Sequence, residues 1–379
     1  MVAKKLKVVV LYGGKSGEHE VSLRSAASVF HRLDRNQFEV IPVAIDKAGR
    51  WLAQRPETVS NAREVLPVHL DAPQVVLIPG EAGGRSRFFC LNGELPAYLG
   101  PRGEVDVIFP VVHGTFCEDG TLQGLLELAD VAYVGCGVLA SAVGMDKEFA
   151  KRLLRDAGVP IVPYICVKKG QWSASPKEWI SSVASQLGGY PVFVKPANSG
   201  SSVGVHQVKS LSELAPAMED AFNYDTKVLI EKAVSAREIE FSVLEHPEPS
   251  QPPLVSVPGE IVPSHSFYSY EAKYLDEAGA KLEIPAQLSE NQATQAKALA
   301  SKTFQALDCE GLARVDLFLD RHTGEFFVNE VNTLPGFTSI SMYPKLWEKS
   351  GIEYSDLLTR LVDLARARHS TKKMLKRDL

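Results

Sequence analysis

The chain has 379 residues and a formal net charge of −5; 45% of its residues are hydrophobic and 23% are charged. This composition is typical of a soluble globular protein, and the length allows two or three domains. The acidic balance argues against a nucleic-acid partner, which would require a basic domain or stripe. A basic tail over 367–379 is interpreted as a cationic, frayed last helical turn, with these basic residues: Lys372, Lys373, Lys376 and Arg377.

The N-terminal segment MVAKKLKVVVLYGG begins like a signal peptide, but its apolar run is short and breaks at Gly13-Gly14, so it predicts a β-strand. No stretch approaches the roughly 18 apolar residues of a membrane helix, so no membrane partner is expected. The cysteines lie far apart without a CxxC pair, which favours reduced thiols and a cytoplasmic protein. They are Cys90, Cys117, Cys136, Cys166 and Cys309.

Strand and helix patterns alternate over residues 1–140 and predict an N-terminal α/β lobe with a parallel sheet. The strands are predicted at 7–14, 38–45, 105–114 and 131–135, and the helices at 19–33 and 121–130. Residues 50–103 are rich in Pro and Gly and predict no definite element. Ligands bind beyond the carboxyl ends of the strands in such sheets, so the loops GGKSGEHE and HGTFCEDG are candidate site loops.

The remaining chain predicts two mixed lobes, a central one at 146–233 and a C-terminal one at 234–366, so the fold class is α/β combined with α+β. Gly158 and Pro160 end a first helix. The further expected elements are a strand–loop–strand unit at 189–208, two strands in 227–244, a helix near 290–307, a hairpin at 314–332 and a C-terminal helix.

The hairpin RVDLFLDRHTGEFFVNEVN places polar residues where apolar ones are expected. A three-residue loop at 322–324, with its glycine in the left-handed conformation, pairs Arg321 with Glu325. Residues directly opposite each other share a face of the hairpin, with Cβ atoms about 5 Å apart. In this register one face carries four polar side chains: Arg314, Asp316, Glu330 and Asn332.

Two carboxylates at such a separation repel each other unless a proton or a cation lies between them. Oxygen ligands without His or Cys select Mg²⁺ or Mn²⁺, which complete their shells with water and substrate phosphates. Alternatively, the four side chains form the solvated polar face of an edge hairpin. The hairpin alone leaves both interpretations open.

Lys195 ends an apolar strand and opens the small-residue loop PANSGSSVG, whose amides and hydroxyls suit phosphate oxygens. The loop matches neither the P-loop nor the GxGxxG pattern, and a plain hairpin turn is the alternative. The segment LIEKAV at 229–234 offers backbone groups between two lobes for the edge of an adenine, or is a simple strand crossover.

Eight segments in this order make the chain resemble the D-alanine–D-alanine ligases of the ATP-grasp superfamily over nearly its whole length. The segments are GGKSGEHEVSL, HGTFCEDGTLQG, MDK, VKPANSGSSVGV, IEKAVSAREIE, YSYEAKY, RVDLFL and NEVNTLPGFTSISMYP. The resemblance implies an N-terminal α/β lobe and a two-lobed ATP-grasp domain. It also implies that ATP phosphorylates one D-alanine and that a second D-alanine attacks the acyl phosphate, giving a dipeptide for peptidoglycan. Two Mg²⁺ or Mn²⁺ ions and a homodimer are usual in the family.

The resemblance assigns three residues to the two metal ions, with Glu330 as the bridge: Asp316, Glu330 and Asn332. The residues that it assigns to ATP are Lys147, Lys195, Ser201, Ser202, Glu231, Lys232, Val234, Glu238 and Lys273. Arg314 and the Gly336 amide match the groups that stabilise the tetrahedral oxyanion.

For the amino-acid substrates, the resemblance assigns Glu18 to the ammonium group of the first D-alanine and places His113 nearby. Ser341 and the Met342 amide match the cradle for the carboxylate of the second D-alanine, and Arg314 also contacts substrate. A hydrogen-bonded triad of Glu18, Ser201 and Tyr274 is expected to tie three lobes together over the closed site. All these assignments are expectations from the resemblance.

Tyr274 favours the dipeptide product over D-alanyl-D-lactate, the product of a depsipeptide ligase. Cys117 departs from the pattern, because the family has glycine there, and it would strain the turn after His113 if that glycine has a positive φ. An inert small residue is the expectation for Cys117. A nucleotide sensor without chemistry is a further alternative, which the retained Arg314 disfavours. A dehydrogenase fails for want of a GxGxxG loop.

Overall fold

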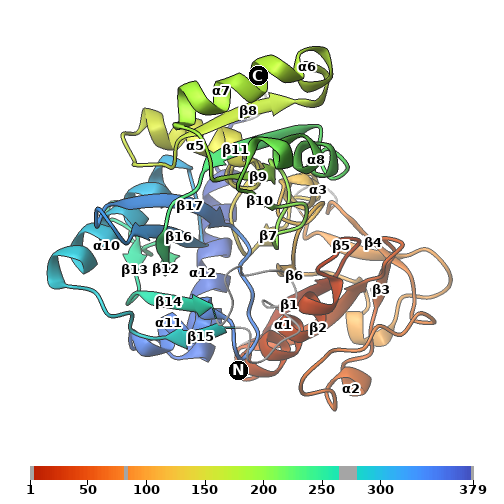
Figure 1. Ribbon diagram of the computed structural model, residues 1–379. Helices are drawn as coiled ribbons and strands as arrows, with labels where there is room; N and C mark the ends of the chain where they lie inside the picture. The colour runs from red at the N-terminus through yellow and green to blue at the C-terminus, as the bar shows by residue number, and fades with distance from the viewer. Residues whose placement is uncertain (1–3, 81–83, 264–279, 377–379) are drawn as a thin grey trace.

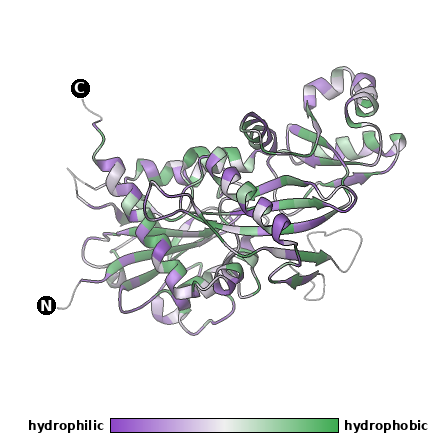
Figure 2. Cartoon of the chain, turned by 90° about the vertical axis from the view of Figure 1, so that its left-hand side faces the viewer, coloured by the Kyte–Doolittle hydropathy of each residue, from purple (hydrophilic) through white to green (hydrophobic). Residues whose placement is uncertain are grey.

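The computed structural model describes residues 4–80, 84–263 and 280–376, and three main sheets organise the chain (Figure 1). The strands of these sheets are largely hydrophobic, and polar residues lie mainly on helix surfaces and loops (Figure 2). The mixed α/β class expected from the sequence is confirmed. Tyr274 and Lys273 lie outside the described residues.

The N-terminal sheet has the order β3-β2-β1-β6-β7, in which β1, β2, β6 and β7 run parallel and β3 is an antiparallel edge. Its strands are β1 (Leu6–Gly13), β2 (Phe38–Ile45), β3 (Trp51–Ala53), β6 (Val107–Val112) and β7 (Ala132–Tyr133). The helices of this part are α1 (His19–Arg32) and α3 (Thr121–Leu128). The structure confirms the predicted strands and helices. The strands have continuous apolar runs because both faces of a parallel sheet are buried.

The segment for which the sequence predicted nothing contains several short elements. They are β3, α2 (Pro56–Val59), β4 (Val75–Ile78), β5 (Arg87–Cys90) and the 3₁₀ turn η1 (Ala97–Leu99). Strands β4 and β5 pair only with each other, in an antiparallel two-stranded sheet. Elements this short contain too few residues to show a periodic hydrophobic pattern.

The central sheet has the order β10-β9-β11-β8, with antiparallel neighbours throughout. Its strands are β8 (Tyr164–Lys168), β9 (Val192–Pro196), β10 (His206–Val208) and β11 (Lys227–Lys232). Its helices are α6 (Lys169–Ala174), α7 (Pro176–Leu187) and α8 (Leu211–Ala221). The predicted strand–loop–strand unit is therefore β9, the glycine-serine loop and β10.

The C-terminal sheet has the order β15-β14-β12-β16-β17, and β13 also pairs with β12. Its strands are β12 (Ala236–Leu244), β13 (Leu254–Val255), β14 (Gly259–Pro263), β15 (Ala280–Glu283), β16 (Leu312–Asp320) and β17 (Phe326–Asn332). Helices α4 (Val138–Met145), α5 (Lys147–Asp156) and α10 (Glu290–Ala306) share its hydrophobic core. Strands β11 and β12 are consecutive but belong to different sheets, so the connector at 233–235 links two lobes.

The last two helices of the chain pack against its N-terminal lobe. Residues of α11 (Met342–Lys349) and α12 (Tyr354–Lys373) share a hydrophobic core with β1, β6 and α1 of the N-terminal lobe. Within α12, the Lys372 ammonium lies 2.5 Å from Glu127 and the Lys373 ammonium 3.3 Å from Asp130. The prediction of a frayed basic turn was therefore wrong for these two lysines, because acids on the N-terminal lobe anchor them.

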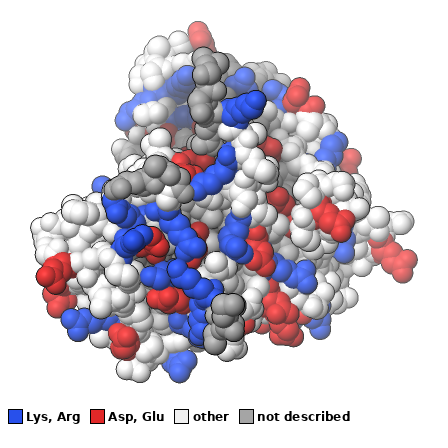
Figure 3. Space-filling view, turned by 180° about the vertical axis from the view of Figure 1, so that it is seen from behind, with Lys and Arg blue, Asp and Glu red and all other residues white. Residues whose placement is uncertain are grey.

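Lys and Arg side chains gather around the middle of the rear face, where Asp and Glu side chains lie beside them (Figure 3). Within the described ranges, no helix combines the length and apolar character that crossing a bilayer requires.

Candidate active site

The hairpin of β16 and β17 brings four polar residues together as predicted. Asp316 lies opposite Glu330, and Arg314 lies opposite Asn332. Strand β12 adds a further acid to this row, because Glu240 pairs with Asp316 from the other side. Three carboxylates thus lie across three neighbouring strands.

The turn of this hairpin differs from the prediction. The Asp320 amide donates to the Glu325 carbonyl at 2.9 Å, which leaves a four-residue loop, and the predicted pairing of Arg321 with Glu325 is wrong. Leu317 pairs with Val328, and the register shifts between Asp316 and Leu317. The extra residue is a β-bulge in β17 that restores the predicted register at the polar end.

Asp320 explains the longer loop. Its carboxylate accepts hydrogen bonds from the amides of His322 and Thr323 at 2.7 and 2.9 Å, and these bonds lower the pKa of the carboxyl group. Such an Asx turn competes with a shorter hairpin turn. Gly324 then closes the loop with φ 72°.

Arg314 is held by two acids. Its Nε and Nη2 atoms each donate to an Asp316 oxygen at 2.7 Å, and Nε lies 3.1 Å from Glu240. Burial disfavours the charged guanidinium, but Asp316 and Glu240 outweigh it and raise the Arg314 pKa above its ordinary value. Asn332 also donates to Asp316, at 3.2 Å. Glu240 was not predicted from the sequence, although its alternation with Glu238 places both on one face of β12.

These residues provide oxygen donors suited to a hard divalent cation. Asp316 and Glu330 supply carboxylates, and Asn332 can supply its amide oxygen. Such a set, without His or Cys, fits Mg²⁺ or Mn²⁺.

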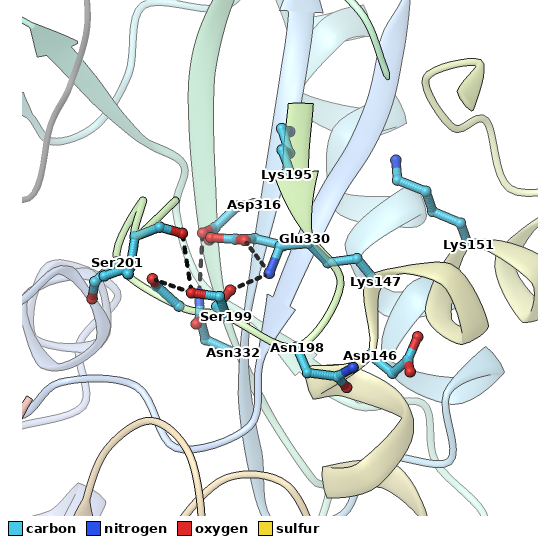
Figure 4. Close-up of polar contacts among 12 residues, drawn as sticks. Asp146, Lys147, Lys151, Lys195, Asn198, Ser199, Ser201, Asp316, Glu330 and Asn332 are labelled. Atoms are coloured by element: carbon cyan, nitrogen blue, oxygen red, sulfur yellow. Dashed lines mark hydrogen bonds and ion pairs between the residues drawn. The ribbon is translucent and has the colours of Figure 1, made fainter. Parts of the chain in front are cut away.

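Lys147 connects this acidic row to the glycine-serine loop. Its ammonium donates to the Ser199 carbonyl at 2.7 Å and lies 3.8 Å from a Glu330 oxygen (Figure 4). The Asp146 carboxylate caps α5 by accepting from the amides of Glu148 and Phe149, both at 3.1 Å. The cap fixes the first turn of α5, and therefore the starting point of the Lys147 side chain.

Lys195 and Glu231 form a buried ion pair between β9 and β11. The other Glu231 oxygen lies 2.6 Å from the ammonium of Lys151, a residue that the sequence analysis did not select. Burial opposes ionisation of Glu231, but the two lysines prevail and lower its pKa to about 2. Lys151 lies one helical turn after Lys147, and this i,i+4 spacing could have drawn attention to it.

The glycine-serine loop reaches the N-terminal lobe. The Ser201 hydroxyl donates to the Glu18 carboxylate, so two members of the expected triad are in contact. Ser201 and Ser202 have φ angles of 52° and 59°, a region that non-glycine residues adopt at some cost. This backbone conformation accompanies the approach of the Ser201 side chain to Glu18.

His113 is buried directly after β6, as the first residue of the loop HGTFCEDG. Its ring nitrogens lie 3.0 Å from the Leu334 carbonyl and 3.2 Å from the Ser25 hydroxyl, and Glu118 lies 3.7 Å away. Burial disfavours the charged form, but Glu118 outweighs it and raises the imidazole pKa. His113 therefore joins the N-terminal lobe to the loop after β17.

Cys117 does not have the positive φ that was considered for it. The left-handed residues of this turn are Gly114 and Phe116, with φ 78° and 67°. Cys117 is buried, and burial raises the pKa of its thiol to about 12. The expected inert thiol is consistent with both findings, and the turn after His113 accommodates the cysteine.

The loop after β17 leads into α11. A Cβ on Gly336 would lie 2.8 Å from the Ser341 hydroxyl, so only glycine fits there without a shift. Ser341 accepts a hydrogen bond from the Thr338 amide at 3.0 Å and precedes Met342, the first residue of α11. Amides at a helix start have no partner within the helix and favour anions such as carboxylates.

The predicted adenine segment lies at the crossing between lobes. The Lys232 amide donates to the Pro163 carbonyl at 3.0 Å, and the Lys232 side chain is exposed. Val234 is half-buried in the connector, and Glu238 follows on β12. Burial lowers the pKa of Lys195, but Glu231 outweighs burial and raises it. Glu238 makes a smaller contribution in the same direction as Glu231. Residues of both sheets therefore surround the Lys195 ammonium.

Two family models match this chain. The D-ala D-ala ligase N-terminus matches residues 7–136, and the D-ala D-ala ligase C-terminus matches residues 153–363. D-alanine–D-alanine ligase A of Bradyrhizobium diazoefficiens is 53% identical over 99% of both chains. D-alanine–D-alanine ligase of Shouchella clausii is 47% identical over 99% of this chain and 98% of the relative.

Solved structures agree with these relatives. D-alanyl-alanine synthetase A of Vibrio cholerae has a TM-score of 0.79 at 32% identity, covering 97% of this chain and 99% of that one. The VanG D-Ala:D-Ser ligase of Enterococcus faecalis has a TM-score of 0.80 at 34% identity, covering 96% of this chain and all of that one. With both family models and near-complete coverage in agreement, this chain belongs to the D-alanine–D-alanine ligase family.

Proposed function

We propose that this enzyme uses ATP to join two D-alanines into D-alanyl-D-alanine, through a D-alanyl phosphate, with release of ADP and phosphate. One observation carries the proposal: Glu18 of the N-terminal lobe, Ser201 of the central lobe and the Lys147–Glu330 pair meet at a single site. The full-length identity to D-alanine–D-alanine ligases supports the same reaction. A sensor that only binds ATP would have no need of Arg314 beside the acidic row.

Lysines of three segments bind the phosphates of ATP. Lys147, Lys195 and, beyond the described residues, Lys273 supply positive charge to the phosphate chain, and Ser201 and Ser202 of the loop donate hydrogen bonds to it. The adenosine is bound by four residues of the lobe crossing: Glu231, Lys232, Val234 and Glu238.

Asp316, Glu330 and Asn332 would hold the two Mg²⁺ or Mn²⁺ ions. When bound, the ions neutralise the charge of the phosphates and of the phosphoryl group in transfer. Arg314 and the Gly336 amide stabilise the oxyanion that forms when the second D-alanine attacks, for which preorganised donors contribute about 3 kcal/mol each.

The two amino acids bind to two different groups of residues. Glu18 pairs with the ammonium group of the first D-alanine, near His113. The Ser341 hydroxyl and the Met342 amide hold the carboxylate of the second, at the start of α11. Contact between Glu18 and Ser201 keeps two lobes together over the site and excludes water, which would otherwise hydrolyse the acyl phosphate.

D-alanine is the acceptor that the relatives support best. A D-Ala:D-Ser ligase is about as similar in fold as a D-alanyl-alanine synthetase, so the fold alone does not select the acceptor. The 53% identical relative is a D-alanine–D-alanine ligase, which favours D-alanine over D-lactate. We further propose that the enzyme works in the cytoplasm as a homodimer and supplies peptidoglycan precursors.

Phosphate release and product mass test the proposal. The protein is incubated with ATP and Mg²⁺ and with D-alanine, L-alanine, or D-alanine plus D-serine or D-lactate. Release with D-alanine alone and a D-alanyl-D-alanine mass are expected. Product only when D-lactate or D-serine is added would reassign the acceptor, and no release at all would refute ligation. A Glu330→Gln variant should fold normally and lose turnover at least about 100-fold.

A further inference from the structure

Helix α5 carries a buried lysine that the proposed mechanism does not use. The Lys151 side chain is only 2% exposed and lies on the same side of α5 as Lys147, four residues earlier. Lysines are almost never fully buried unless they are paired. The partner of Lys151 is Glu231, with 2.6 Å between its ammonium and Oε1.

Glu231 divides its two oxygens between two lysines. Oε1 faces Lys151, and Oε2 forms the ion pair with Lys195. Lys151 comes from a helix whose residues pack into the core of the C-terminal sheet, whereas Glu231 and Lys195 belong to the central sheet. The cluster of Lys151, Glu231 and Lys195 therefore bridges the two lobes that flank the proposed nucleotide site.

The charge of this cluster depends on Lys151. Two ammonium groups and one carboxylate leave one net positive charge, whereas Lys195 and Glu231 alone would be neutral. Charges in a buried site are weakly screened, so this difference acts over several ångströms. Burial lowers the pKa of Lys151, Glu231 opposes that effect, and the charges of Lys195 and Lys147 add to the lowering, as expected for neighbouring cations.

We propose that Lys151 is a positioning residue of the nucleotide site, which shares the Glu231 carboxylate with Lys195 so that Lys195 retains net positive charge for the phosphates of ATP. This role rests on the proposed ligase function, since it presumes that ATP binds beside Lys195. Lys151 acts through Glu231 and needs no contact with the nucleotide. The ligand class is a nucleoside triphosphate, recognised here by its phosphate charge.

Four variants separate this role from a purely structural ion pair. Lys151→Met and Lys151→Gln both make the cluster neutral, whereas Lys151→Arg keeps its one net positive charge. Arg152→Met is the matched control, because it removes a positive charge from the solvent-facing side of the same helix, where Arg152 pairs with Glu148. A structural pair would weaken folding without making ATP affinity follow the charge of the cluster.

The measurement is the dissociation constant of ATP with Mg²⁺ by calorimetry, together with KM and kcat. Lys151→Met should weaken ATP binding about tenfold or more, with kcat within about threefold of the parent. Lys151→Arg should keep the affinity within about threefold of the parent, and Arg152→Met should leave it unchanged. Thermal unfolding of each variant shows whether it is folded.

Parent-like ATP affinity in Lys151→Met, or Lys151→Arg as weak as Lys151→Met, would overturn the proposal. If Lys151→Met does not fold, Lys151→Gln decides the question, since it removes the charge but keeps a hydrogen-bond donor for Glu231, and it must weaken ATP binding to a similar extent. The unmodified protein separates this outcome from failure of the proposed function. If the parent protein forms D-alanyl-D-alanine, the ligase function stands whatever ATP affinity the Lys151 variants have.

Discussion

Asp225 anchors the base of the glycine-serine loop, and removing it should release the loop. The carboxylate accepts hydrogen bonds from the backbone amide and the side-chain amide of Asn198, at 2.8 and 3.0 Å. It also accepts from the Lys227 amide at 3.1 Å, at the start of β11. The same loop carries Ser199 and Ser201, which contact Lys147 and Glu18. Asp225→Ala thus disturbs the loop without touching either contact.

The magnitude follows from the three hydrogen bonds. Each contributes about 0.5–1.5 kcal/mol net, and the half-buried position of Asp225 favours the lower part of this range. The expected loss of local stability is about 2 kcal/mol, which raises the population of the locally open loop about 30-fold. Because the loop must be ordered to bind phosphates, the KM for ATP should rise by about tenfold and exceed the change in kcat.

Hydrogen exchange followed by mass spectrometry measures the opening directly. Peptides covering 197–203 should exchange faster in Asp225→Ala, while those of the N-terminal sheet stay unchanged. Asp225→Asn keeps one acceptor oxygen and should show an intermediate effect. Glu219→Ala removes an equal charge from an exposed position on α8 and serves as the control. Unchanged exchange of the loop in Asp225→Ala would refute the anchoring argument.

Three further outcomes are expected. Ser201→Ala should reduce kcat/KM for D-alanine about tenfold with little change in overall stability, and an unaltered ratio would show that its contact with Glu18 is dispensable. The folded-state pKa of Glu231, about 2, lies below its ordinary 4.5, so its stabilising contribution is complete above about pH 4.5 and is lost as the pH falls toward 2. The free energy of unfolding of Glu231→Gln, measured by urea denaturation at several pH values, should therefore depend less on pH in that window than that of the parent. Cys117 should resist iodoacetamide at pH 8 in the folded protein, because its thiol is buried with a pKa of about 12, and labelling as fast as in urea would contradict this.

The polar face of the β16–β17 hairpin could be predicted from the sequence because strand pairing follows simple rules. Asp316 and Glu330 were placed opposite each other by counting from the turn, and they are opposite. The count succeeded although the loop has one more residue than assumed, since the bulge in β17 compensates. A bulge leaves no clear trace in one sequence, so the agreement at the polar end and the error at the turn have one cause.

The residues that were missed act through tertiary contacts. Lys151 looks like an exposed residue of an amphipathic helix, and only the arrival of Glu231 from another sheet shows that it is buried. Asp225 occupies a polar stretch that predicts a turn and gives no hint of Asn198. Local patterns predict elements well, but they do not specify which sheet an element joins.

The return of α12 to the N-terminal lobe affects how the chain can be made. Its residues Leu357, Leu361 and Val362 are buried in one core with Val8 and Phe109. On the ribosome, the first strands emerge long before α12 is synthesised. The apolar face that α12 covers therefore stays exposed until residues 354–373 have been added. A nascent chain stopped before residue 354 would keep that face uncovered, which makes premature termination an aggregation hazard even though all the proposed site residues would already be present.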